Sequence, residues 1–112
     1  ADDDYGLRES LQALFELAGY DVRVARDGVE ALRALEEREP DLLVLDLMMP
    51  RMNGQGVVQE MERRQLRPRI PVLILSASGD AQTDAEQLHA DGVVCKPFDI
   101  DVVLDAAQRL VG

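Results

Sequence analysis

Three polar residues end apolar stretches of this chain, and each carries a group that can do chemistry: a carboxylate, a hydroxyl or an ammonium. They are Asp46 after Leu42–Leu45, Ser76 after Val72–Leu75, and Lys96 after Val93–Cys95. Short, continuous apolar runs are typical of strands buried on both faces of a parallel sheet. Because the carboxyl ends of parallel strands share one edge of a sheet, we expect the three groups to converge there.

The chain opens with three successive aspartates, Asp2, Asp3 and Asp4, directly ahead of a predicted helix. They could form a solvated end or the acidic start of that helix, and the helix should also place them near Asp46. Carboxylates held close together repel and raise one another's pKa, a conflict that a divalent cation removes. Mg²⁺ prefers oxygen ligands and typically binds one or two carboxylates plus a phosphate. With the hydroxyl and the ammonium of the other strand ends, the set suits phosphoryl transfer to a carboxylate.

The elements that must position these groups alternate between helix and strand. Helical apolar spacing is found at Leu7–Ala18, Val29–Leu35, Val57–Met61, Ala81–Ala90 and Ile100–Leu110, with the thinnest apolar stripe at Ala81–Ala90. Strands are predicted at Leu42–Asp46, Val72–Ser76 and Val93–Lys96, and a half-buried edge strand at Asp21–Arg26. Asp27, followed three residues later by Glu30, can cap the second helix. This order predicts an α/β, doubly wound fold around a parallel sheet.

Composition limits the classes of protein that the chain can belong to. Its 112 residues fit one domain, and no apolar run approaches the ~20 residues that cross a bilayer, so we expect no membrane association. The net charge of −10 argues against nucleic-acid contact by this chain, because phosphate contacts need clustered lysine and arginine. Cys95 follows two valines, so we expect a buried thiol, and a lone cysteine suits a reducing, cytoplasmic setting.

Separate motifs, in this order and spacing, resemble the receiver domains of two-component response regulators, the CheY-like superfamily. The matching residues are Asp2-Asp3, Asp46 with the following Leu-Met-Met-Pro-Arg-Met-Asn-Gly54, Ser76-Ala77, and Lys96-Pro97-Phe98. The resemblance covers essentially all of residues 1–112. It implies a single receiver domain with a flavodoxin-like sheet whose strand order is 2-1-3-4-5.

The resemblance also implies how a phosphoryl group would be handled. Asp46 would accept it from a phosphohistidine. Lys96 would pair with the phosphoryl oxygens, and Ser76 would hydrogen-bond them and draw its loop inward. The bond between Lys96 and Pro97 would be cis.

A Mg²⁺ site is implied in the same way. Asp3 and Asp46 would bind the ion directly, and Asp2 mostly through water. The backbone carbonyl of Met48 would complete the protein ligands.

The partner implied by the resemblance is a sensor histidine kinase or a phosphotransfer protein. The chain would catalyse only its own phosphorylation and dephosphorylation and would not otherwise be an enzyme. The phosphorylated state would switch the face formed by the family's fourth helix, fifth strand and fifth helix, here 81–90, 93–96 and 100–110. That face is also the family's usual dimer surface, so a homodimer through it is open.

Four alternatives use the same residues differently. The chain could be a receiver module of a hybrid kinase or phosphorelay, or a receiver-like interaction module that takes no phosphate, although the acceptor set is complete. An aspartyl-phosphate phosphatase usually needs a second aspartate shortly after the nucleophile, where this chain has Met48. A flavin-binding protein of this fold needs a loop rich in serine, threonine and glycine after the first strand, and no such loop is present.

The sequence departs from the family pattern at Val93, where the family often has a tyrosine or phenylalanine that swings inward on activation. An aliphatic side chain cannot exchange between inward and exposed positions with the same effect. We therefore expect the switch to rely on Ser76 and the loop after it, or the coupling to be weaker.

A second departure concerns the start of the chain. The family begins with a hydrophobic strand that leads into the acidic pair, whereas here only Ala1 precedes Asp2. That strand lies inside the sheet, so its absence would leave a gap of about two strand spacings of ~4.8 Å, with buried unpaired groups that cost of order 1–3 kcal/mol each. We expect the receiver domain to be truncated before the acidic pair, with upstream residues present in the working protein or another segment in the slot.

Overall fold

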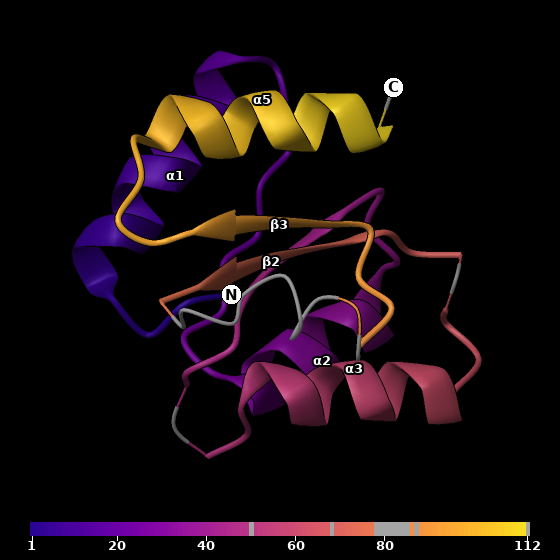
Figure 1. Cartoon of the computed structure of the whole chain (residues 1–112). Helices are drawn as coiled ribbons and strands as arrows, with labels where there is room; N and C mark the ends of the chain where they lie inside the picture. Colours follow the sequence, from indigo (N-terminus) through magenta and orange to yellow (C-terminus); the bar gives the residue numbers. More distant parts are fainter. Residues whose placement is uncertain (50, 68, 78–85, 87, 112) are drawn as a thin grey trace.

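The structure is a computed structural model that describes residues 1–49, 51–67, 69–77, 86 and 88–111. In chain order the elements are α1 (Tyr5–Leu17), α2 (Gly28–Glu37), β1 (Leu43–Asp46), α3 (Gly54–Arg63), β2 (Val72–Ser76), β3 (Gly92–Cys95) and α5 (Ile100–Val111). Helices and strands follow one another from α2 to α3 and β2 as predicted, whereas α1 is followed directly by α2 (Figure 1). The helix predicted at Ala81–Ala90 falls mostly outside the described residues.

The three strands form a parallel sheet in the order β1-β2-β3. Figure 1 shows α1 and α5 on one face of this sheet and α2 and α3 on the other. The α/β fold with a parallel sheet is therefore confirmed. The register pairs Asp46 with Leu75 and Ser76 with Cys95, so the strands end together at one edge.

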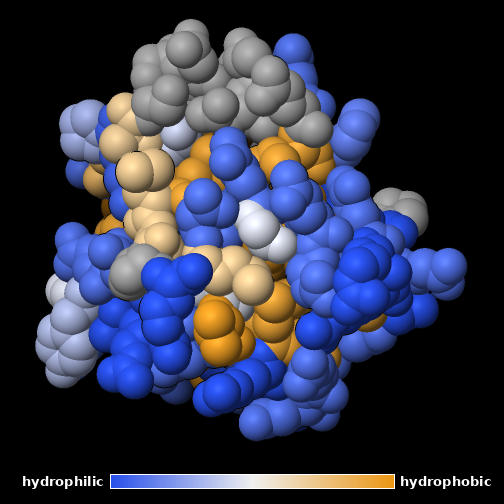
Figure 2. Space-filling model, turned by 90° about the horizontal axis from the view of Figure 1, so that it is seen from below, coloured by the Kyte–Doolittle hydropathy of each residue, from blue (hydrophilic) through white to orange (hydrophobic). Residues whose placement is uncertain are grey.

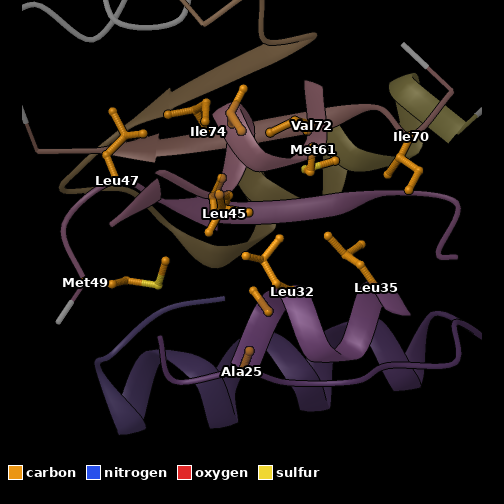
Figure 3. Packing of buried hydrophobic residues seen from close by; sticks show 13 residues of the cluster. Ala25, Leu32, Leu35, Leu45, Leu47, Met49, Met61, Ile70, Val72 and Ile74 are labelled. Atoms are coloured by element: carbon orange, nitrogen blue, oxygen red, sulfur yellow. The ribbon is translucent and has the colours of Figure 1, made fainter. Parts of the chain in front are cut away.

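The central strand β2 explains why its sequence is continuously apolar. All five of its residues are buried, because strands lie on both sides of it and helices on both faces. Alternate side chains enter two separate clusters, as the two-residue period of a strand requires. Val72 and Ile74 join the cluster under α2 and α3 (Figure 3), whereas Leu73 and Leu75 join the cluster under α1 and α5.

Polar side chains set where three of the helices begin. Asp4, Asp27 and Asn53 each accept a hydrogen bond from the backbone N–H three residues further on, which satisfies a donor that the first helical turn leaves unpaired. The cap predicted at Asp27 is confirmed. At the other end of α1, Gly19 has a φ of +98°, a left-handed conformation that glycine adopts without strain.

Backbone hydrogen bonds hold the first two residues between β1 and the segment before α2. The Ala1 nitrogen donates to Val44 O (2.6 Å), and Asp46 N donates to Ala1 O (2.9 Å). On the other side, Asp2 N donates to Ala25 O (3.0 Å). A segment that forms backbone hydrogen bonds with a neighbour on each side has the bonding pattern of a strand between them. Here the segment runs next to β1 and parallel to it.

A cavity of about 350 Å³ continues from this point along the line of that strand. Residues 21–25 line one side and residues 41–44 the other, with Leu11 and Phe15 of α1 and Leu35 of α2 among the remaining walls. The cavity lies where the missing strand was expected. The presence of further strand residues there stays a prediction.

Two expectations from the sequence are wrong. Residues Asp21–Arg26 do not form a strand, since among the described residues the backbone pairing of this segment with the sheet is limited to the bond from Asp2 N to Ala25 O. Cys95 is exposed rather than buried. It alternates with the buried Val94 on β3, the last strand of the described sheet, so its side chain points to the other face.

The surface over α2 and α3 is mostly hydrophilic, with apolar side chains visible between the charged ones (Figure 2). Ion pairs cross this surface, where Arg64 contacts both Glu36 of α2 (2.7 Å) and Glu60 of α3 (2.9 Å). Within the described ranges, no helix combines the length and apolarity that crossing a membrane requires.

Joining five β-branched apolar residues ahead of Ala1 is expected to fill the cavity and stabilise the fold. Burying such a side chain contributes about 1.5–3 kcal/mol, against about 1–2 kcal/mol for ordering each backbone residue, and the new backbone groups also pair with β1. Each kcal/mol added to the free energy of unfolding should raise the melting temperature by about 4 °C. Thermal unfolding followed by circular dichroism measures this.

An extension of five serine and glycine residues is the matched control, because it adds the same length without apolar surface. Its melting temperature should equal that of the 112-residue chain. Equal rises with both extensions would show that cavity filling is not the cause.

Candidate functional site

Three of the side chains predicted to converge are in direct contact at the carboxyl edge of the sheet. Lys96 Nζ lies 3.2 Å from Asp46 Oδ2 and 3.3 Å from Asp2 Oδ2. The carboxylates are almost completely buried, with 4% of the Asp46 side chain and 3% of the Asp2 side chain exposed, whereas Lys96 is 25% exposed. One ammonium therefore bridges two buried carboxylates.

The ends of the three strands set these positions. Asp46 ends β1 and Ser76 ends β2, and Lys96 directly follows β3. The backbone N–H of Lys96 donates to Ser76 O at 2.7 Å, which continues the ladder by one residue. Ser76 is buried and stands on the central strand between the other two strand ends. The Lys96–Pro97 bond is cis, as expected.

Asp2, Asp3 and Asp46 form an acidic group that could hold a metal ion. Each offers a carboxylate oxygen, and the three oxygens lie within 4.8 Å of one another. Asp3 is exposed, whereas Asp2 is buried and also accepts a bond from Asp4 N (2.9 Å). A cluster of hard oxygen donors with one solvent-facing member fits Mg²⁺, which keeps several of its waters.

The loop after β1 returns at once toward the strand it leaves. Met48 N donates to Asp46 Oδ1 (3.2 Å), and Gly54 N donates to Leu47 O (3.0 Å). A Cβ on Gly54 would lie 2.6 Å from Asp46 O, so only glycine allows this approach. The loop therefore holds the Met48 backbone beside Asp46, while 74% of the Met48 residue surface is exposed.

The electrostatics of the site follow from burial and from this charge arrangement. Burial raises the pKa of the Asp46 carboxyl, and the Asp2 charge adds to this, although the Met48 N–H and the Lys96 ammonium oppose it. Burial by itself would lower the pKa of Lys96, but the two carboxylates outweigh burial and raise that pKa. The lysine is thus held charged, while ionisation of the Asp46 carboxyl is made less favourable.

Two contacts near the site were not predicted from the sequence. Arg8 Nη1 donates to Asp2 O at 2.9 Å, which ties the first turns of α1 to the acidic pair. Arg51 pairs with Asp27 from the loop after β1. The sequence predicts a capping role for Asp27, but no periodicity or motif in it indicates either contact, because each joins a loop or terminus to a separate element.

Comparison with known families and proteins gives a consistent result. The model of the response regulator receiver domain matches residues 1–108. The chain is 36% identical over 112 residues to the DNA-binding dual master transcriptional regulator RpaA of Synechocystis, and 38% identical over 112 residues to response regulator MprA of Mycobacterium leprae. These alignments cover 98% of this chain but 46% and 48% of the relatives, so the chain spans about half of their length.

Solved structures are similar over nearly the whole chain. The receiver domain of the Francisella response regulator 1452 superposes with a TM-score of 0.88 at 31% identity, covering 98% of this chain and 91% of that one. Response regulator TrrA of Thermotoga maritima, in complex with Mg(2+)-BeF, superposes with a TM-score of 0.83 at 29% identity, covering 97% and 93%.

Asp46→Asn is expected to stabilise the protein at neutral pH in buffer without divalent cations. The fold favours the protonated form of Asp46, so the folded state binds that proton more tightly than the unfolded chain does. The contribution of Asp46 to the free energy of unfolding is therefore fully favourable below about pH 4, the ordinary pKa of aspartate. This contribution is lost as the pH rises through the raised pKa of Asp46 in the folded state. Asparagine does not ionise, so the variant should melt at a higher temperature at pH 7.

The difference in melting temperature between Asp46→Asn and the wild type should become smaller as the pH falls toward 4. Thermal melts across the pH range would show this. Asp105→Asn is the matched control, because Asp105 lies exposed on α5 in an ion pair with Arg109. A lower melting temperature for Asp46→Asn at pH 7 would mean that attraction to Lys96 outweighs burial, contrary to this prediction.

Proposed function

The chain belongs to the response-regulator receiver domains of two-component systems, and we propose that Asp46 accepts a phosphoryl group from the phosphohistidine of a partner. The observation that carries this proposal is the bridge from Lys96 to Asp46 and Asp2 at the open edge of the sheet. It brings a nucleophile, a fixed cation and further carboxylates within reach of one small group, which phosphoryl transfer requires.

In the proposed reaction an oxygen of Asp46 attacks the phosphorus of the phosphohistidine. An oxygen–phosphorus bond forms as the phosphorus–nitrogen bond breaks, and the imidazole leaves with the electron pair and takes a proton. Lys96 is already 3.2 Å from the Asp46 carboxylate and would turn to the phosphoryl oxygens as their charge spreads. Ser76 would hydrogen-bond the same oxygens from the neighbouring strand end.

The donor set supports Mg²⁺ as the cofactor of this step. Asp3, Asp46 and the Met48 carbonyl would hold the ion, and Asp2 would reach it through water. When bound, Mg²⁺ supplies positive charge against the phosphoryl oxygens and orients them for transfer. The chain's own part is to hold Asp46 and the Met48 backbone in place and to keep Asp2 and Lys96 paired beside them.

The aspartyl phosphate would be the signal rather than an intermediate of turnover, so we propose no further enzymatic activity. The proposed output is the face formed by β3, α5 and the helix predicted at 81–90, which would change when Ser76 draws its loop toward the phosphoryl group. The same face is our proposed homodimer surface.

The proposed phosphoryl donor is a sensor histidine kinase or a phosphotransfer protein. A receiver module in a hybrid kinase or phosphorelay is the alternative, and it would use the same side chains. Relatives of about twice this length include one described as DNA-binding. With a net charge of −10, we propose that this chain itself makes no nucleic-acid contact.

Incubation with acetyl phosphate and Mg²⁺ is expected to add one phosphoryl group to the protein. Intact mass spectrometry should show the added mass in the wild type and not in Asp46→Asn, since asparagine lacks the attacking oxyanion. Lys96→Gln should fold but phosphorylate on the order of 10²-fold more slowly, in line with the loss of one preorganised charge-stabilising group.

Asp105→Asn on α5 is the control for these measurements, because it removes an exposed carboxylate whose ion-pair partner is Arg109 and not Lys96. It should phosphorylate like the wild type. A wild-type protein that stays unmodified under these conditions, or an Asp46→Asn variant that is modified equally, would exclude Asp46 as the acceptor.

Beryllofluoride, a mimic of the phosphoryl group, should perturb the protein mainly around Ser76 and Lys96. Val93 is partly buried and packs against the cluster under α2 and α3, so we expect it to keep this position. Backbone and methyl NMR spectra with and without beryllofluoride measure this, with Val93→Tyr as a comparison that restores an aromatic side chain. A large rearrangement centred on Val93 in the wild type would contradict the prediction.

A further inference from the structure

An ion pair joins the loop after β1 to the start of α2. Arg51 contacts a single oxygen of Asp27 with two nitrogens, Nε at 2.8 Å and Nη2 at 2.6 Å. The Asp27 side chain is only 4% exposed, whereas that of Arg51 is 53% exposed. The other Asp27 oxygen accepts Glu30 N at the first turn of α2, so one buried carboxylate serves both the helix and the loop.

The charge state of Asp27 suits this double use. The Glu30 N–H and then the Arg51 guanidinium lower the pKa of Asp27 despite its burial, so the carboxylate is held ionised. A guanidinium and an ionised, buried carboxylate form charge-assisted hydrogen bonds, which are stronger than hydrogen bonds between neutral groups. The pair therefore resists the movement of the loop away from α2.

The backbone of Arg51 gives independent support for a positional role. Its φ is +62°, in the left-handed region that residues with a Cβ seldom adopt and that costs of order 1–3 kcal/mol. A residue stays in such a conformation only when its surroundings hold it there. The paired side chain of Arg51 is the contact that does so on the α2 side.

A second tether lies one residue further along. Gly28 N donates to Met52 O at 3.0 Å, and a Cβ on Gly28 would lie 2.3 Å from that oxygen. The start of α2 and the loop are thus as close as backbones allow. The other end of the loop is closed by the bond from Gly54 N to Leu47 O. Between the two attachments lies the Met48 backbone, which bonds Asp46 Oδ1.

We propose that Asp27 and Arg51 are positioning residues for the acceptor site: their pair holds the described loop residues after β1, 47–49 and 51–53, so that the Met48 backbone stays beside Asp46 and faces the Mg²⁺ ligands. The expected effect on Mg²⁺ affinity rests on the proposed function. The role of the ion pair in holding the loop does not. Neither residue touches the acceptor carboxylate, so both act through the loop.

Arg51→Gln and Asp27→Asn test the pair from its two sides. Asparagine caps helices about as well as aspartate, so Asp27→Asn weakens the ion pair and keeps the start of α2. In each variant the dissociation constant for Mg²⁺ should rise about tenfold, the lower end of the effect of groups that orient metal ligands. The double variant should lose no more Mg²⁺ affinity than either single variant, because both substitutions remove the same contact.

A second readout requires no metal. In Mg²⁺-free protein the backbone amide resonances of Met48 and Met49 should shift or broaden in both variants, while those of β2 stay in place. Arg109→Gln is the matched control, because it removes a guanidinium from an exposed ion pair with Asp105 on α5. It should change neither the Mg²⁺ affinity nor the loop resonances.

The outcomes separate this inference from the proposed function. Folded variants with wild-type loop resonances would overturn the positioning role, as would additive losses of Mg²⁺ affinity in the double variant. A wild-type protein that takes up no Mg²⁺ would instead reject the proposed function. In that case the loop resonances alone decide whether Asp27 and Arg51 hold the loop.

Discussion

The structure depends on keeping two like-charged carboxylates buried side by side at the edge of a parallel sheet. Asp2 and Asp46 are both almost fully removed from solvent, and isolated buried charges of this kind are costly. Their contacts with Lys96 offset part of that cost, but burial and the neighbouring Asp2 charge still raise the pKa of Asp46. The site thus holds two carboxylates against one ammonium. A divalent cation or a change of charge at Asp46 would reduce their repulsion.

The rest of the fold holds these groups in place against their repulsion. The central strand β2 aligns the ends of β1 and β3, and its two sets of side chains anchor the sheet to both helical layers. Ala1 and Asp2 are fixed by backbone bonds to Val44, Asp46 and Ala25, and by the contact from Arg8. Ala1 and Asp2 are therefore tied by backbone hydrogen bonds to the segments on both sides of them.

The loop after Asp46 shows how the site is attached to more distant parts of the molecule. It is closed on itself through Gly54 and held to α2 through Asp27, Gly28 and Arg51. Similarity to solved response-regulator structures covers 97–98% of the chain. The start of α2 is thereby joined to the backbone that follows Asp46.

The sequence by itself determined the fold class and the placement of Asp46, Ser76 and Lys96, because buried parallel strands require continuous apolar runs and bring their carboxyl ends to one edge. It also determined the cap at Asp27, since capping depends on residues only three positions apart. Only the tertiary structure decided that Asp21–Arg26 lacks a ladder, that Cys95 is exposed, and that Arg51 and Arg8 contact residues of other elements. These outcomes depend on which segments and backbone groups come to lie side by side in the folded chain, and local periodicity does not encode that arrangement.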